Sequence, residues 1–148
     1  MDSRRNKLCL WRDCVLYLGD SFDPELHRHH AVQCCIALEG KLQIRSHPHE
    51  QFEECTSAVI GANVSHAIAN PDGPLCIIYL EKNSADYSSI LDFQGVSTEQ
   101  GLRANPLLFD TKFSGSLRAA LASAYESSLD PTEANDLRER CLQLFRGH

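Results

Sequence analysis

The sequence lacks the features of a membrane-spanning, secreted or nucleic-acid-binding protein. Its longest apolar runs, residues 34–38 and 75–80, are far shorter than a spanning helix. Residues 1–7 contain no apolar segment of the kind found in a signal peptide. Basic residues are few, 14 against 20 acidic ones, so the net charge is −6 and a basic face for nucleic acid or anionic lipid is missing. We therefore expect a soluble, cytoplasmic protein that by itself binds neither nucleic acid nor a membrane.

The cysteines form no recognisable disulfide or zinc pattern. There are seven, an odd number, and no two are arranged as CxxC. Most lie inside apolar runs, whereas a disulfide framework prefers an even number with turn-rich spacing. We predict that they are small buried hydrophobic residues in a reducing compartment.

What the sequence does contain is enough apolar residues for one folded domain. Of 148 residues, 43% are hydrophobic and 23% are charged. Before about residue 83, short β-type runs alternate with turn clusters, which is typical of a sandwich or barrel. The predicted strands are 8–11, 15–18, 26–38, 41–45, 51–55, 58–60, 65–69 and 75–81. Glu39-Gly40 predicts a tight hairpin turn.

After residue 83 the pattern changes to that of helices. One apolar stripe with three- and four-residue spacing consists of Phe113, Leu117, Leu121, Ala124, Tyr125 and Leu129. A second consists of Ala134, Leu137, Cys141, Leu144 and Phe145. Asp130, Pro131 and Glu133 form a start signal for this second helix, and Gly147 is a plausible stop. A shorter helix is expected from Ser97 or Thr98 and must end before Pro106.

Several histidines are spaced as metal ligands would be. In an extended strand alternate residues share a face, so His27, His29, Gln33 and Cys35 point the same way. If a later strand brings His66 beside them, three imidazoles converge, and such a set suits divalent Zn, Ni, Fe or Mn. The candidate metal ligands are therefore His27, His29, Gln33 and His66. The alternative is that the same histidines are neutral and hydrogen-bonded in a pocket without metal.

These residues resemble the two motifs of the cupin superfamily. The first motif is matched by Gly19, His27-Arg28-His29, Gln33 and Gly40, and the second by His66 and Asn70. The resemblance implies a double-stranded β-helix barrel over residues 8–82, and hence a mainly β protein with a C-terminal helical hairpin. Gln33 replaces the usual glutamate, the turn before His66 is altered, and the gap from Gly19 to His27 is two residues longer than usual.

A narrower resemblance is to the N-terminal sensor half of AraC-type transcription regulators. It is carried by residues 27–33, by 58–60 leading to 64–67, and by 78–81 with the helical stretch that follows. It implies that a cupin barrel (residues 1–82) binds a small effector. It also implies that a helical appendage (residues 83–148) mediates dimerisation and leads to a DNA-binding half that this chain does not contain.

The leading hypothesis is thus an effector-sensing domain without enzymatic activity, with a small molecule in the mouth of the barrel. The predicted lining is Trp11, Tyr17, His27, His29, Gln33, Cys35 and His66. One alternative is a free-standing metal-dependent cupin enzyme of the dioxygenase or isomerase type. Another is a module that only dimerises and has a dry barrel. Because two apolar stripes exceed what one hairpin needs, we also predict a homodimer built on residues 114–146.

Overall fold

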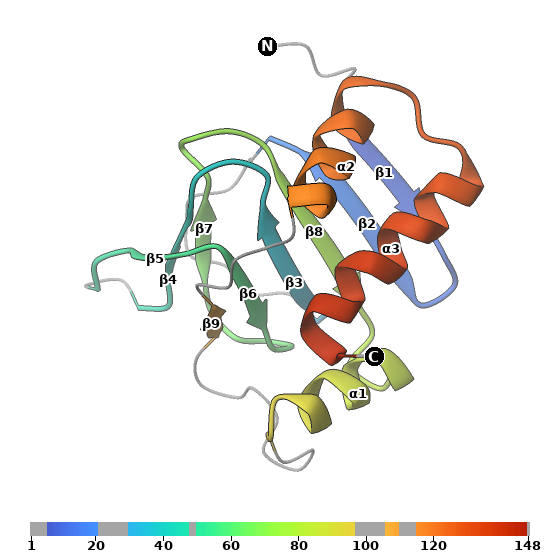
Figure 1. Ribbon diagram of the computed structural model, residues 1–148. Coiled ribbons are helices and arrows are strands. Elements are labelled where there is room, and N and C mark those ends of the chain that lie inside the picture. Colours follow the sequence, from blue (N-terminus) through green and yellow to red (C-terminus); the bar gives the residue numbers. More distant parts are fainter. Residues whose placement is uncertain (1–5, 21–29, 48–49, 97–105, 110–114, 148) are drawn as a thin grey trace.

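The computed structural model describes residues 6–20, 30–47, 50–96, 106–109 and 115–147, and within them it shows two antiparallel sheets and three helices (Figure 1). The larger sheet has the strand order β1 (Lys7–Leu10), β2 (Cys14–Gly19), β8 (Leu75–Leu80), β3 (Val32–Ala37), β6 (Ser57–Ile60), β9 (Leu107–Phe109). The smaller sheet has the order β5 (Glu53–Cys55), β4 (Leu42–Arg45), β7 (Ala67–Ala69).

All eight predicted strands are confirmed in type, with small differences in their bounds. The largest difference is in β3, which starts at Val32, while residues 26–29 of the predicted strand lie outside the described residues. The ninth strand, β9, was not predicted, because its three apolar residues are too few to show alternation. It pairs with β6, so a segment beyond residue 83 contributes to the larger sheet.

The predicted hairpin at Glu39-Gly40 is wrong, because β3 and β4 lie in different sheets and do not pair. Gly40 instead turns the chain from one sheet to the other, with a φ of 62°. A Cβ there would clash with the side chain of Asp72, so glycine is required both by the backbone conformation and by this close approach. Among the described residues no strand pair joins the two sheets, and closure into a barrel is not seen there.

The helices are α1 (Ala85–Phe93), α2 (Gly115–Glu126) and α3 (Pro131–Arg146). The start signal for α3 is confirmed, since the side chain of Asp130 accepts a hydrogen bond from the Glu133 amide at 2.9 Å. Its predicted end is also confirmed, with Gly147 as the C-cap. The predicted helix from Ser97 or Thr98 falls outside the described residues.

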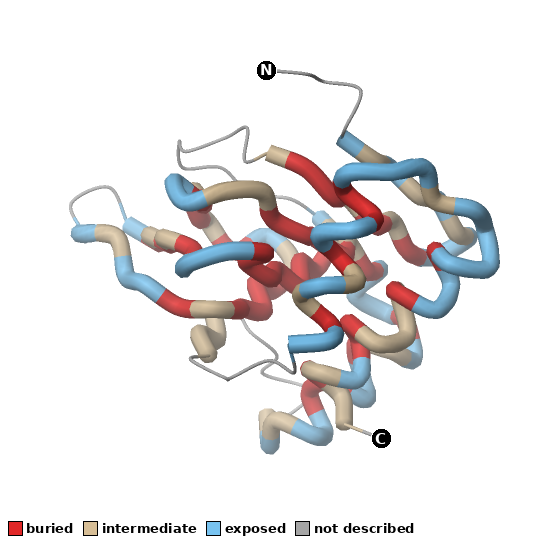
Figure 2. Tube along the Cα trace, turned by 45° about the horizontal axis from the view of Figure 1, so that its top comes forward, coloured by how far each residue is buried: buried red, intermediate tan, exposed pale blue. Residues whose placement is uncertain are grey.

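The larger sheet is the middle layer of the molecule, with buried residues on both faces (Figures 1 and 2). On one face the helices pack against alternate residues of β2, β3 and β8, for example Leu16, Cys34 and Ile78. On the other face the smaller sheet packs against the remaining residues, for example Cys35 and Ile77. Every residue of β3 is consequently buried, which explains why this strand is apolar at every position except Gln33.

The helical stripes are buried against the chain's own sheet. Leu121, Leu137, Cys141 and Phe145 all belong to the core beneath the helices, together with Leu142, which the predicted stripe omitted. The apolar surface that motivated a dimer through residues 114–146 is therefore largely covered within one chain. In the part of the chain that the structure describes, no helix is long and apolar enough to cross a membrane.

Candidate functional site

The candidate site lies on the face of the larger sheet that is turned toward the smaller sheet. Gln33 and Cys35 alternate with the helix-facing residues of β3, so both point into the core between the sheets. Directly across on β8, Tyr79 is opposite Gln33, and on β6 Ile60 is opposite Gln33. Tyr17 of β2 packs against the same core. The predicted alignment of Gln33 and Cys35 on one face is thus what the structure shows, and Tyr17, another residue of the predicted lining, packs on the same side.

Gln33 is the polar residue that distinguishes this face. It is only 2% exposed, and its Oε1 atom is buried with no hydrogen-bond partner among the described residues. Buried amide oxygens are nearly always paired, because an unpaired one loses its hydration without compensation. An apolar wall with one unpaired acceptor is an arrangement that a ligand's donor group can complete.

Two tyrosines share this face: Tyr79 borders Gln33, and Tyr17 is opposite Ile77. Burial, with smaller contributions from Cys35 and Tyr17, raises the pKa of Tyr79 to about 12, so its phenol stays protonated at neutral pH. Burial also raises the pKa of Tyr17, whose hydroxyl donates a 2.6 Å hydrogen bond to the backbone oxygen of Asp20. Tyr79 was missing from the predicted lining, although the alternation of Leu75, Ile77 and Tyr79 in β8 could have placed it on this face.

His66 is buried, with 1% of its surface exposed, and directly precedes β7 of the smaller sheet. It precedes Ile68 by two residues, so alternation turns its ring toward the core between the sheets. Its Nδ1 atom lies 2.8 Å from the Val64 carbonyl, which can only accept, so Nδ1 carries the proton in the neutral ring and Nε2 carries the lone pair. Asn70, the other residue of the second motif, is also buried, and its Nδ2 donates to Pro74 O at 2.7 Å.

Trp11 is not part of this face, contrary to the prediction. Its indole donates a 2.6 Å hydrogen bond to Asn135, and the Arg138 guanidinium lies 4.8 Å from its ring centre. Both partners belong to α3, so Trp11 fastens the end of β1 to the helical layer. It lies on the opposite side of the sheet from Gln33.

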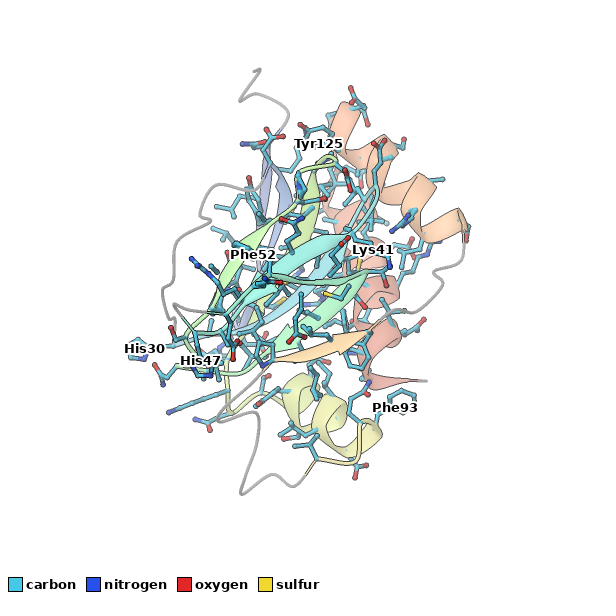
Figure 3. The ribbon with its side chains drawn as sticks, turned by 90° about the vertical axis from the view of Figure 1, so that its left-hand side faces the viewer. His30, Lys41, His47, Phe52, Phe93 and Tyr125 are labelled. Carbon is cyan, nitrogen blue, oxygen red and sulfur yellow. The ribbon has the colours of Figure 1, made fainter. Side chains whose placement is uncertain are left out.

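The remaining predicted metal ligands are His27 and His29. Both lie outside the described residues. Within the described part of the chain, no group of three or more His, Cys, Asp or Glu side chains is arranged to hold a metal ion. His30 and His47 are exposed, as expected for solvated residues, and both lie at the same edge of the molecule (Figure 3). The predicted metal centre therefore stays a prediction.

The cysteines are confirmed as free thiols, six of them buried. Burial raises the pKa of Cys34 and of Cys35 well above the ordinary value, so both stay protonated. A hydrogen bond with Cys141, together with burial, raises the pKa of Cys76 in the same direction. Cys35 therefore supplies a small apolar wall at the candidate site and no nucleophile.

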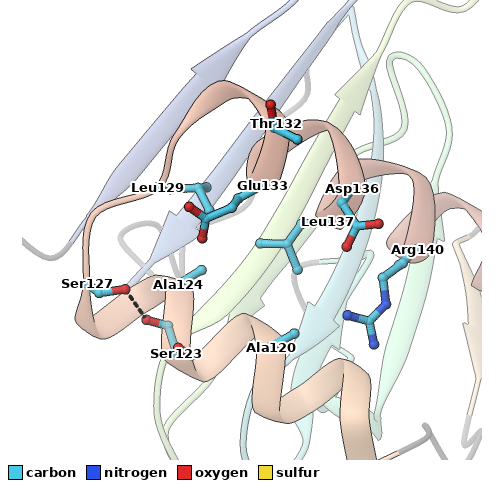
Figure 4. A pocket seen from close by; sticks show the side chains of 10 residues that line it. All are labelled: Ala120, Ser123, Ala124, Ser127, Leu129, Thr132, Glu133, Asp136, Leu137 and Arg140. Atoms are coloured by element: carbon cyan, nitrogen blue, oxygen red, sulfur yellow. Dashed lines mark hydrogen bonds between the residues drawn. The ribbon is translucent and has the colours of Figure 1, made fainter.

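A separate hollow of about 410 Å³ lies between α2 and α3 (Figure 4). Its floor is apolar and its rim is polar. The lining residues are Ala120, Ser123, Ala124, Ser127, Leu129, Thr132, Glu133, Asp136, Leu137 and Arg140. It belongs to the helical layer and contains none of the predicted site residues.

No protein-family model matches the sequence, and a search of curated proteins finds no match. Several solved structures are similar in shape. A cupin-2 domain containing protein from Shewanella frigidimarina is 20% identical, with 51% of this chain and 78% of that one covered and a TM-score of 0.41. A cupin superfamily protein from Desulfitobacterium hafniense is 16% identical, with 55% and 84% covered and a TM-score of 0.42.

AerE from Microcystis aeruginosa is 20% identical, with 53% of this chain and 41% of that one covered and a TM-score of 0.43. At TM-scores below 0.5 and identities of 20% or less, these similarities do not by themselves establish a family or a function.

Proposed function

We propose that this chain is a cupin-type sensor domain that binds a small molecule between its two sheets, beside Gln33. The observation that carries the proposal is the buried Oε1 of Gln33, which has no partner in the described part of the chain. The proposal is also supported by the cupin-like motif residues Gly40 and His66. Gly40 makes the turn between the sheets, and His66 is buried facing the space between them.

Each residue of the face has a distinct role in this proposal. The apolar side chains of Cys35, Ile60 and Ile77 exclude water from the ligand. Gln33 accepts a hydrogen bond from the ligand, which strengthens because competing water is absent. Tyr79 is a neutral phenol at physiological pH, so it can form a hydrogen bond with the ligand but does not act as a base. The described part of the face therefore favours a ligand with an uncharged hydrogen-bonding group.

A hydrogen-bonded path leads from this face to the helices. Tyr17 donates to the backbone oxygen of Asp20 at 2.6 Å, and Tyr125 of α2 donates to the side-chain Oδ1 of Asp20 at 3.2 Å. A ligand that moves Tyr17 thereby acts on the C-terminal end of α2. We propose more specifically that the chain is the sensor half of an AraC-type regulator. A DNA-binding half would then respond to the resulting shift in the population of conformations.

The orientation of His66 favours a metal-dependent cupin enzyme as the second candidate. Metal-binding histidines usually donate their other ring N–H to a carbonyl or carboxylate, as Nδ1 of His66 does to Val64. However, His66 and Gln33 supply two donors, whereas catalytic zinc sites use three protein ligands. The described residues alone therefore do not complete such a centre.

The test is a thermal-shift screen of small uncharged molecules that contain a hydrogen-bond donor. A genuine ligand at about one hundred times its Kd stabilises the protein by about 2.7 kcal/mol. We expect hits on the wild-type protein to lose this shift in Gln33→Met and to keep it in Gln94→Met. Gln94 is a matched control, because its amide bonds to Phe145 in the helical layer. Hits that bind Gln33→Met as well as wild type would refute the proposal.

A further inference from the structure

The outer edge of β1 carries exposed apolar side chains. β1 is the terminal strand of the larger sheet, and among the described residues no strand pairs with its outer edge. Leu8 is 63% exposed and Leu10 is 71% exposed, and with Phe93 they are the large hydrophobic residues that the described part of the chain leaves most open. An edge of this kind is a template for the addition of another strand.

The backbone groups of the same two leucines point outward. Trp11 donates its N–H to Cys14 O at 2.8 Å, so the backbone groups of Trp11 face β2. In an antiparallel strand these groups alternate in direction from one residue to the next. Those of Cys9 therefore face β2, while those of Leu8 and Leu10 face away from the sheet. The bond from Glu81 N to Asp13 O at 3.3 Å, on the other side of β2, agrees with this alternation.

We propose that β1 pairs antiparallel with β1 of a second copy of this chain, about a two-fold axis at Cys9. In this register Leu8 is opposite the partner's Leu10, and Leu10 is opposite the partner's Leu8. Both pairs are hydrogen-bonded pairs, because the outward N–H and C=O groups belong to these residues. Cys9 is opposite the partner's Cys9 in the closer, non-hydrogen-bonded kind of pair. A two-fold interface requires this kind of self-complementarity.

The residues of β1 favour a second copy as the occupant. The run from Leu8 to Leu10 carries no charge and no proline, the usual devices that block strand addition. Lys7, the one charged residue of the strand, donates instead to Tyr125 O of its own chain at 3.1 Å. The leucines that meet across the axis would bury each other on one face of the extended sheet.

The proposed interface is small, so the dimer should be weak. Stable interfaces bury a total of about 1,200 Å² or more, and two leucines from each chain contribute far less than that. The association should therefore be reversible and concentration-dependent. This surface differs from the helical one predicted from the sequence, whose apolar stripes are buried within the chain.

The first experiment is sedimentation equilibrium over a wide range of protein concentration, under reducing conditions. We expect a monomer–dimer equilibrium in the wild type and a Kd at least tenfold higher in Leu8→Lys/Leu10→Lys. Phe93→Lys is the matched control, because Phe93 is also 59% exposed but lies in α1, and it should leave the Kd unchanged. Circular dichroism checks that each variant is folded.

The second experiment does not depend on the leucine variants. Cys9 is the only cysteine that is not buried, so oxidation with diamide should act on it selectively. Cα atoms in a non-hydrogen-bonded pair lie about 4.5 Å apart, which a disulfide can span. We expect a covalent dimer whose disulfide joins two Cys9 residues, and no such dimer from Cys9→Ser.

The two experiments can each overturn the proposal. A wild-type protein that stays monomeric at every concentration contradicts it, and so does a double variant that dimerises with an unchanged Kd. An oxidised wild-type dimer that lacks the Cys9 disulfide contradicts the register. If the edge captures only strands of other proteins, the wild type alone will sediment as a monomer.

Discussion

Replacing Gln33 with methionine should make the protein more stable. Gln33 is 2% exposed among apolar neighbours, and its Oε1 has no partner in the described residues. Burial of an uncompensated amide costs about 1–3 kcal/mol. Methionine has a similar unbranched shape and no hydrogen-bonding requirement, so the same space can be filled without that penalty. We expect the free energy of unfolding to rise by about 1 kcal/mol after small packing losses.

The assay is urea unfolding followed by circular dichroism, with wild type and Gln33→Met compared at equal m-values. Gln94→Met is the control in the opposite direction. The Gln94 side chain donates to Phe145 O at 2.8 Å, so its removal leaves a carbonyl without that partner and should cost about 1 kcal/mol. The pair of variants therefore separates an unsatisfied glutamine from a satisfied one in the same protein.

A loss of about 1 kcal/mol or more in Gln33→Met would refute the reasoning, since it would mean that the amide is satisfied within the folded chain. Gln33 would then be a structural residue, and the proposed ligand site would lose its main support. A gain would indicate that the chain keeps a glutamine that reduces its own stability, which is typical of a residue retained for function.

Two further predictions test the same face. The free energy of unfolding should fall as pH rises from about 9 to about 12. Burial raises the pKa of Cys35 and of Tyr79 in the folded chain, so the unfolded chain loses these protons first. Urea midpoints at several alkaline pH values test this, and Tyr79→Phe should flatten the upper part of the decline. If His66 and Gln33 do bind a divalent metal, Gln33→Glu should raise zinc occupancy after equilibrium dialysis, because a carboxylate adds negative charge at a ligand position, and unchanged occupancy would show that residue 33 does not contact a metal.

The strands were predictable because their sequences either alternate between apolar and polar residues or form a continuous apolar run. The shared face of Gln33 and Cys35 was correctly assigned by this periodicity alone. The three residues of β9 were not predictable, because their place in the sheet depends on pairing with β6, which is more than forty residues earlier. Local pattern contains no information about such a long-range pairing.

Trp11 shows how a turn can reverse a prediction. In the β1–β2 hairpin, Cys9 is opposite Leu16 and Leu10 is opposite Val15, so odd residues of β1 share a face with even residues of β2. Trp11 therefore lies with the helix-facing side, while Tyr17 lies on the other. Whether odd residues of one strand share a face with odd or with even residues of the next depends on the register at the turn. The alternation within each strand does not reveal that register.

The end of α2 connects the two proposals. Tyr125 accepts a hydrogen bond from Lys7 of β1 through its backbone oxygen and donates one to Asp20, which in turn accepts from Tyr17. The candidate ligand face, the helical layer and the exposed strand are therefore linked by hydrogen bonds through Tyr125 and Asp20. Coupling between two binding events is reciprocal, so a ligand that shifts Tyr17 and thereby favours β1 pairing must bind the dimer more tightly than the monomer by the same factor. A sensor that acts through its own self-association needs this linkage, and an enzyme whose chemistry is confined to the space between the sheets does not.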